Sequence, residues 1–141
     1  MGKIIQGHPI IPGSAEGLGL VANEPLSFWG GYDYHTGEIT DRRHPLSGQI
    51  AAGKILAVPF TRGSSTTTAV LLEAVRAGTA PAAIITTGVD SFFALASIVA
   101  NVMYQSPIPI IAVPSDDFAS LQTGDMLNID EEGRIVISQV I

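Results

Sequence analysis

The sequence predicts an α/β domain with a mainly parallel central sheet and a second, small β layer. The middle of the chain alternates apolar runs that are typical of buried strands with patterns that are typical of helices. Strands are expected over 54–58, 81–86 and 107–113, and helices over 66–77 and 91–104. Strand–helix–strand units of this kind connect right-handedly and build parallel sheets. Near the C-terminus, "TGDMLNIDEEGRIVIS" predicts an antiparallel hairpin that turns at Glu131, Glu132 and Gly133.

The N-terminal third is expected to be rich in β-structure. Residues 3–6 and 18–22 are short β-like runs separated by turns that contain Gly and Pro. A third apolar run, "PLSFWGG", ends on a pair of glycines. We expect its Trp29 to lie in the core, with an interface as the alternative because Trp is enriched there. Residues 30–48 form a polar stretch that is too long for a simple hairpin turn, and loops of that length often carry function.

Local signals mark where the two central helices begin and end. Gly78 ends the first helix, and Asp90 or Ser91 caps the second. The second helix, "SFFALASIVANVMY", is apolar almost all round, so we expect it to be buried on more than one side. A short helical turn is expected at "SDDFASL".

Composition narrows the class of protein. A chain of 141 residues is long enough for one hydrophobic core, and residues 1–141 are expected to form a single domain. Only 14% of the residues are charged, which suggests that a partner covers part of the surface. The net charge of -6 without a run of Lys or Arg argues against nucleic acid, and no apolar segment is long enough to span a membrane. We therefore expect a cytoplasmic location.

One turn, "VPFTRGSSTTT", concentrates polar chemistry between a predicted strand and a predicted helix. It belongs to the carboxyl edge of the sheet, where α/β folds bind ligands. The N–H groups and the dipole at the helix start favour anions, Gly63 allows close approach to the backbone, and Arg62 can hold a carboxylate or phosphate through two hydrogen bonds. A Ser at this place has a stabilised alkoxide and could act as a base or a nucleophile.

The alternative interpretation of this turn is that its hydroxyl groups only cap the helix. Two other motifs do not fit the residues. The turn lacks the Lys and the glycine spacing of a Walker loop, and Ser64 is not followed by the second Gly of a nucleophile elbow.

Two segments together resemble a known family. They are "GGYDYHTGEITDRRHPLSG" and "AGKILAVPFTRGSSTTTAVLLEAVRAGTAPAAII", and with them nearly the whole chain resembles the small subunit, or swivelling domain, of aconitase X proteins. That family includes cis-3-hydroxy-L-proline dehydratases and phosphomevalonate dehydratases. The resemblance implies a swivelling β/β/α fold of the aconitase type and the dehydration of a hydroxy acid.

The resemblance also implies roles for individual residues. The family's proton acceptor falls on Ser64 and its carboxylate-binding Arg on Arg62, with Gly63 and Ser65 completing the substrate-binding turn. A separate large subunit is implied, which carries an iron–sulfur cluster or iron on cysteine ligands; no cofactor is expected on this chain, which contains no cysteine. Two departures are Thr61, where the family often has Gly, and Tyr34, where it often has Pro. Thr61 narrows the range of backbone conformations that the turn can adopt. Both departures leave the identity of the substrate undetermined.

The polar stretch 30–48 offers further candidates. Asp41 and His44 either touch substrate or the large subunit, or only hold a turn, and we favour the turn; the role of Asp33 is open. His35 is expected to be exposed. The three histidines have no spacing that gathers them around one metal ion.

The sequence therefore predicts a hydro-lyase subunit, active only with a large subunit, that converts cis-3-hydroxy-L-proline to 1-pyrroline-2-carboxylate. A phosphomevalonate dehydratase is the alternative within this class. A small-molecule binding module without catalysis is the alternative outside it.

Overall fold

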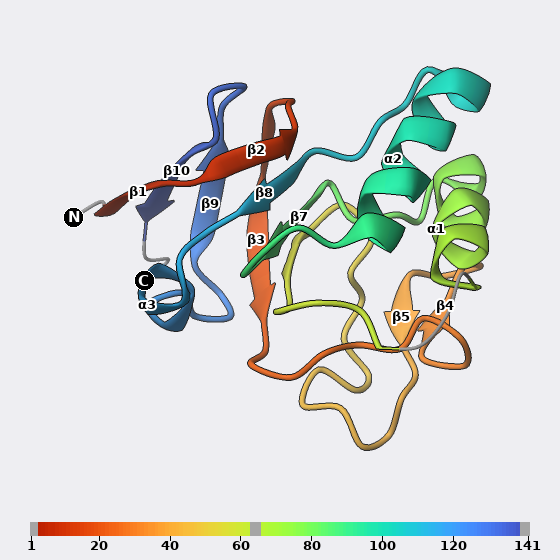
Figure 1. Cartoon of the computed structure of the whole chain (residues 1–141). Helices are drawn as coiled ribbons and strands as arrows, with labels where there is room; N and C mark the ends of the chain where they lie inside the picture. The colour runs from red at the N-terminus through yellow and green to blue at the C-terminus, as the bar shows by residue number, and fades with distance from the viewer. Residues whose placement is uncertain (1–2, 63–65, 139–141) are drawn as a thin grey trace.

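The computed structural model describes residues 3–62 and 66–138. The chain begins with β-structure, alternates strands and helices in its middle, and ends in a hairpin (Figure 1). The elements in chain order are β1 (Lys3–Gln6), β2 (His8–Ile11), β3 (Ala15–Val21), β4 (Tyr32–Asp33), β5 (Glu38–Ile39), β6 (Ile55–Ala57), α1 (Thr66–Ala77), β7 (Ala83–Thr86), α2 (Ser91–Tyr104), β8 (Ile110–Ala112), α3 (Ser115–Ala119), β9 (Met126–Ile129) and β10 (Arg134–Ser138).

The main sheet has a parallel centre, as the sequence predicts. Its strand order is β1-β10-β9-β3-β6-β7-β8-β2. The pairs β3–β6, β6–β7 and β7–β8 are parallel, and the flanking pairs are antiparallel. Because β6 and β7 run parallel, their carboxyl ends lie at the same edge of the sheet. Each strand is followed there by the loop that leads into a helix, α1 after β6 and α2 after β7.

The sheet is nearly closed, which the local sequence pattern did not predict. β1 and β2 stand at opposite ends of the strand order although only Gly7 separates them along the chain. The N–H of Gly7 donates a hydrogen bond to the carbonyl of Gly133 at 2.9 Å. A side chain on Gly133 would come within 2.8 Å of the Gly7 carbonyl. Glycine at both positions therefore permits the close approach that lets one continuous segment join the two edges.

Side chains fill both faces of the sheet. The two long helices, α1 and α2, pack against each other and cover one face, where Leu71 and Phe93 are buried (Figure 1). The short helix α3 covers the other face and buries Phe118 among apolar strand residues. The swivelling β/β/α architecture is thus a mixed sheet with its long helices on one side.

Two burial predictions are wrong. Trp29 is 73% exposed, whereas its neighbour Phe28 is fully buried. The helix α2 buries one stripe of its surface, but Leu95, Ile98 and Val102 on its outer side are exposed. Both errors have the same physical cause: an apolar side chain is buried only where another layer covers it, and the described chain supplies no layer outside α2.

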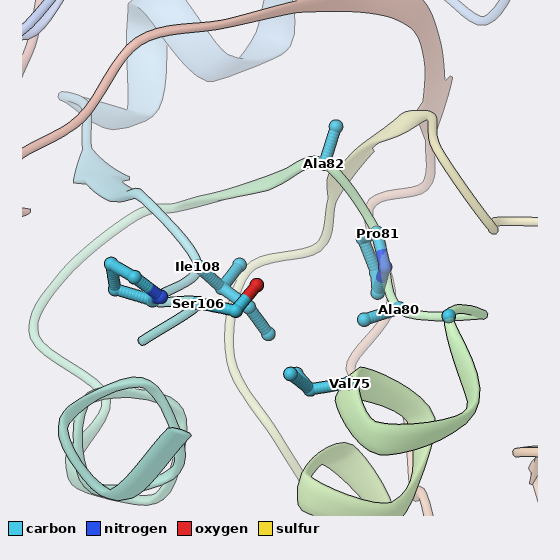
Figure 2. A pocket seen from close by; sticks show the side chains of 8 residues that line it. Val75, Ala80, Pro81, Ala82, Ser106 and Ile108 are labelled. Carbon is cyan, nitrogen blue, oxygen red and sulfur yellow. The ribbon is translucent and has the colours of Figure 1, made fainter. Parts of the chain in front are cut away.

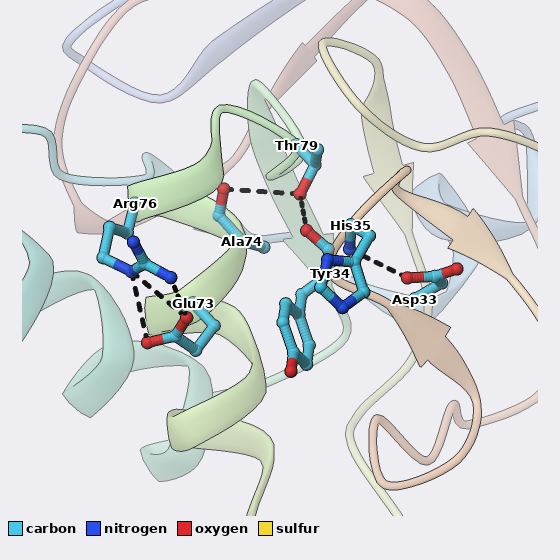
Figure 3. A network of polar contacts seen from close by, with 7 residues as sticks. All are labelled: Asp33, Tyr34, His35, Glu73, Ala74, Arg76 and Thr79. Atoms are coloured by element: carbon cyan, nitrogen blue, oxygen red, sulfur yellow. Dashed lines mark hydrogen bonds and ion pairs between the residues drawn. The ribbon is translucent and has the colours of Figure 1, made fainter.

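The second small β layer is the hairpin β4–β5, which lies within a folded lobe formed by residues 30–48. We call these residues the hairpin lobe. Its Tyr32 is buried and stacks on Phe28 with ring centroids 5.1 Å apart. The hydroxyl of Thr79 donates to the Tyr34 carbonyl at 2.6 Å (Figure 3). The lobe is therefore an integral part of the core on the α1 side and not a free loop.

The exposed side of α1 carries an ion pair close to this contact. Arg76 donates to the Glu73 carboxylate at 2.7 Å (Figure 3). The hydrogen bond from Arg76 holds the pKa of the Glu73 carboxyl below its usual value. Because both groups are in water, the pair contributes little to stability.

Candidate functional site

The hydroxyl-rich turn lies between β6 and α1, where the sequence places it. Residues 55–59 are buried, and the chain then emerges at Phe60, which is 51% exposed. Arg62 is exposed, and α1 begins at Thr66. The candidate residues Gly63, Ser64 and Ser65 lie outside the described residues. The structure therefore describes the two flanks of the turn and not its centre.

The first flank is held by the segment that precedes the hairpin lobe. The backbone N–H of Arg62 donates to the Leu26 carbonyl at 3.0 Å, and Leu26 and Thr61 form a parallel bridge. Leu26 is fully buried, so the Arg62 backbone is fixed against the core. Its side chain remains exposed and is engaged in no ion pair within the described residues. That guanidinium is thus available for a carboxylate or phosphate.

Asp90, which the sequence predicts only as a helix cap, also contacts the loop that follows β6. Its side chain is buried and does cap α2, since it accepts hydrogen bonds from the N–H groups of Phe92 and Phe93. It also accepts hydrogen bonds from the backbone N–H and the hydroxyl of Thr61, at 2.7 and 2.9 Å. The sequence contained a hint of this contact. Thr61 and Asp90 follow neighbouring parallel strands, and the carboxyl ends of such strands share one edge of the sheet.

A second pair of contacts joins the same two loops. Thr87 donates to the Pro59 carbonyl from both its N–H and its hydroxyl, each at 3.2 Å. The segments that follow β6 and β7 are therefore fastened together along their length. A loop that is tied down on this scale is a suitable support for a site that needs defined geometry.

The second flank is the start of α1. Its first turn contains no acidic residue, so the positive end of the helix dipole is not neutralised by its own side chains. The interpretation that the hydroxyl groups of this turn cap the helix is only partly tested. Thr68 is directed elsewhere: its hydroxyl donates to the Phe92 carbonyl in α2 at 3.4 Å. The arrangement at this helix start favours an anion.

His44 of the hairpin lobe is buried and bonded within the protein. His44 is 5% exposed, its Nδ1 accepts from the Leu46 N–H at 3.1 Å, and its Nε2 lies 3.2 Å from the Glu24 carbonyl. An Nδ1 that accepts requires an Nε2 that donates, so the ring is the neutral Nε2–H tautomer. Both nitrogens are satisfied inside the protein, and the interpretation of His44 as a turn residue is confirmed.

The other polar residues of the lobe also hold local turns. The Asp41 carboxylate accepts from the Arg43 N–H at 3.0 Å, and the Asp33 carboxylate accepts from the His35 N–H at 2.8 Å (Figure 3). His35 is exposed, as expected. Across residues 3–62 and 66–138, no group of three His, Cys, Asp or Glu side chains is arranged to hold a metal ion. The same part of the chain contains no helix long and apolar enough to cross a bilayer.

A pocket of about 230 Å³ lies at the opposite edge of the sheet (Figure 2). Pro81 and Ala82 precede β7, and Ile108 precedes β8, so the pocket is at the amino ends of these strands. Its lining is apolar apart from Ser106 and includes no titratable side chain. The turn at the carboxyl edge, with Arg62 and a helix start, is therefore the better candidate for chemistry.

A nearly closed mixed sheet with two long helices on one face defines the chain as a swivelling β/β/α domain. Comparison with known proteins identifies the family to which this domain belongs. The chain belongs to the aconitase X family: residues 4–137 match the family model described as the aconitase X swivel domain.

Similar proteins include both kinds of dehydratase. Over 107 residues, which are 76% of this chain and 18% of the other, it is 45% identical to a cis-3-hydroxy-L-proline dehydratase of Pseudomonas aeruginosa. Over 125 residues, which are 87% of this chain and 91% of the other, it is 38% identical to the phosphomevalonate dehydratase small subunit of Methanothermobacter thermautotrophicus. The chain thus spans about a fifth of the first relative and nearly all of the second.

A solved structure shows the same fold. The crystal structure of Thermococcus kodakaraensis aconitase X in its holo-form superimposes with a TM-score of 0.86 at 33% sequence identity. The match covers 97% of this chain and 99% of that chain.

Proposed function

We propose that this chain is the small subunit of an aconitase X type hydro-lyase, with Ser64 as the proton acceptor. The observation that carries the proposal is the turn between β6 and α1. One of its flanks presents an exposed Arg62 on a fixed backbone, and the other is a helix start without acidic residues. Ser64 stands between them in the sequence.

The chemistry needs a base beside a carboxylate. Arg62 would hold the substrate carboxylate, and Ser64 would accept the proton from the adjacent carbon. A free Ser is far too weakly acidic to serve as a base, so its alkoxide must be stabilised by the helix start, by Arg62 and by exclusion of water. The electron pair left on that carbon forms the C=C bond as the bond to the β-hydroxyl breaks. The proton that lets the hydroxyl leave as water is assigned to the large subunit.

The large subunit is expected to hold the iron–sulfur cluster or iron. This chain contains no cysteine, and the described residues offer no set of metal ligands. Apolar side chains at the same edge support a partner that closes over the turn. Phe60 precedes Thr61 and Val89 precedes Asp90, and both are exposed in this chain, at 51% and 71%. A subunit that covers them would also exclude water from the turn.

For the substrate we favour cis-3-hydroxy-L-proline, which would give 1-pyrroline-2-carboxylate. The identity of 45% with the Pseudomonas aeruginosa dehydratase supports this choice. The alternative is phosphomevalonate, supported by a relative that is a separate small subunit of nearly the same length. A cytoplasmic location belongs to the same proposal, since a chain without cysteine has no need of an oxidising compartment.

The test is to co-express the chain with its large subunit and to assay the complex with cis-3-hydroxy-L-proline and with phosphomevalonate. Ser64→Ala is expected to lower kcat by about 100-fold or more, which is the usual contribution of a general base. Ser65→Ala should have a smaller effect, and Ser14→Ala, an exposed serine outside the turn, should have none. Turnover near the wild-type value in Ser64→Ala would show that Ser64 is not the base.

A further inference from the structure

We propose that Asp90 is a positioning residue, which holds the turn with Arg62 and Ser64 on the N-terminus of α2 through Thr61. This inference rests on the proposed function of the turn, because it assigns Asp90 a role in that site. Asp90 itself is assigned no contact with substrate.

The two oxygens of the Asp90 carboxylate divide their hydrogen bonds between two segments. Oδ1 accepts from the N–H groups of Phe92 and Phe93 at 3.0 and 3.2 Å. Oδ2 accepts from the N–H and the hydroxyl of Thr61 at 2.7 and 2.9 Å. Asp90 is only 8% exposed, and a carboxylate is tolerated there because four donors and the helix dipole compensate it. Bonds to a charged acceptor are also about twice as strong as neutral ones.

The first turn of α2 holds both flanks of the candidate site. Upstream, Asp90 holds Thr61, which directly precedes Arg62. Downstream, the carbonyl of Phe92 accepts from the hydroxyl of Thr68 in the first turn of α1. Thr61 and Thr68 are therefore tethered to Asp90 and Phe92, which lie two positions apart at the start of α2.

Arg62 has a second support besides its neighbour Thr61. Its N–H is held by the Leu26 carbonyl, independently of Asp90. Loss of the Asp90–Thr61 contact should therefore leave the carboxylate clamp largely in place, while it loosens the loop that carries the proposed base. In kinetic terms, kcat should fall while KM changes little.

Thr61 contributes half of this contact through its side chain. The glycine that is implied at this position by the resemblance to the aconitase X family would supply the N–H but not the hydroxyl. The β-branched Thr61 also restricts the backbone more than glycine does. Removal of the Thr61 hydroxyl leaves the α2 cap in place. Such a variant therefore separates the contact of Asp90 with Thr61 from its role as the helix cap.

Four variants of the full chain, in complex with the large subunit, test the proposal. Asp90→Asn keeps a good helix cap but presents an amide donor to the Thr61 donors. Thr61→Val removes only the hydroxyl, and Thr61→Ser restores it. Asp130→Asn is the matched control, since the Asp130 carboxylate also accepts from two backbone N–H groups, those of Glu132 and Arg134, in the β9–β10 turn.

Two measurements are made on each variant: hydrogen exchange at the Thr61 amide, and kcat and KM with cis-3-hydroxy-L-proline and with phosphomevalonate. In Asp90→Asn we expect Thr61 exchange to accelerate at least about tenfold and kcat to fall about tenfold or more, with KM within about threefold. Thr61→Val should lower kcat by about threefold to tenfold. Thr61→Ser and Asp130→Asn should match wild type.

Unchanged Thr61 exchange in Asp90→Asn would overturn the proposal, because Asp90 would not hold the turn. Faster exchange with unchanged kcat would also overturn it, because the contact would be structural only. The failure of the proposed function is a separate result. If Ser64→Ala keeps full turnover while Asp90→Asn loses it, the role of Ser64 is wrong and the positioning role of Asp90 stands.

Discussion

The phenol of Tyr32 donates a hydrogen bond to the carbonyl of Thr79, with 2.7 Å between the two oxygens. This contact joins the hairpin lobe to the second residue after the C-terminal end of α1. Burial of the ring raises the pKa of the Tyr32 phenol well above its ordinary value. The protonated phenol is the donor, so the contact depends on pH.

Tyr32 is expected to make the fold sensitive to alkali. Its pKa is higher in the folded state than in the unfolded chain, where it is about 10. Its contribution to stability is therefore complete below about pH 10 and is lost as the pH rises further. Tyr32→Phe should lower the free energy of unfolding by about 1 kcal/mol at neutral pH and should flatten the decline above about pH 10. Urea unfolding across this range measures both effects, and equal alkaline slopes would contradict the assignment.

Ser97 is expected to be a strong stability determinant inside α2. Its hydroxyl accepts from the Ile108 N–H at 2.8 Å and donates to the Ile108 carbonyl at 2.6 Å. Ser97→Ala leaves both backbone groups buried without this partner, which should cost about 2–3 kcal/mol in unfolding free energy. Ser91→Ala, at an exposed position of the same helix, should change it by less than about 1 kcal/mol. Similar costs for the two variants would argue against the burial of Ser97.

The two sides of α2 should respond differently to substitution. Phe93 is 1% exposed and packs edge-on against Phe28, with ring centroids 5.6 Å apart. Phe93→Ala should lower the free energy of unfolding of the chain by about 3–5 kcal/mol. Val102 is 73% exposed, and Val102→Lys should change it by less than about 0.5 kcal/mol. A large loss in Val102→Lys would mean that another layer covers this side of the helix in the isolated chain.

Arg62→Lys should weaken substrate binding in the two-chain complex. Lys presents a single point charge and cannot reproduce the paired hydrogen bonds of a guanidinium. We expect KM to rise about tenfold, on the scale of one charge-assisted hydrogen bond, with a smaller change in kcat. Arg42→Lys, at an exposed position of the hairpin lobe, is the control. If Arg62→Lys leaves both constants unchanged, Arg62 is not the carboxylate clamp.

The helices were predictable because their signals are local. Both long helices have the predicted bounds, 66–77 and 91–104. Each is defined by neighbouring residues: an apolar period, a Gly78 with positive φ after α1, and the Asp90 cap before α2. The strand–helix alternation likewise predicted the parallel centre of the sheet, since right-handed connections leave few other arrangements.

Contacts between distant residues were not predictable in this way. The approach of Gly7 to Gly133 closes the sheet and joins residues that are far apart in the chain. The folding of residues 30–48 into a lobe depends on the fit of Tyr32 against Phe28 and Thr79. The burial of Trp29 was predicted wrongly for the same reason. The hydrophobicity of a side chain favours burial, but it does not determine whether another part of the chain covers that side chain.

The sequence by itself determined the α/β class, the helix bounds, and the place of the turn that contains Arg62 and Ser64, because each follows from periodicity or from adjacent residues. Only the tertiary structure decided that Asp90 reaches Thr61, that the buried ring of His44 is held between Leu46 and Glu24, and that the outer side of α2 is exposed. These features depend on how strands and helices that are separate in sequence meet in space. The packing of the whole chain sets that geometry, and no local pattern encodes it.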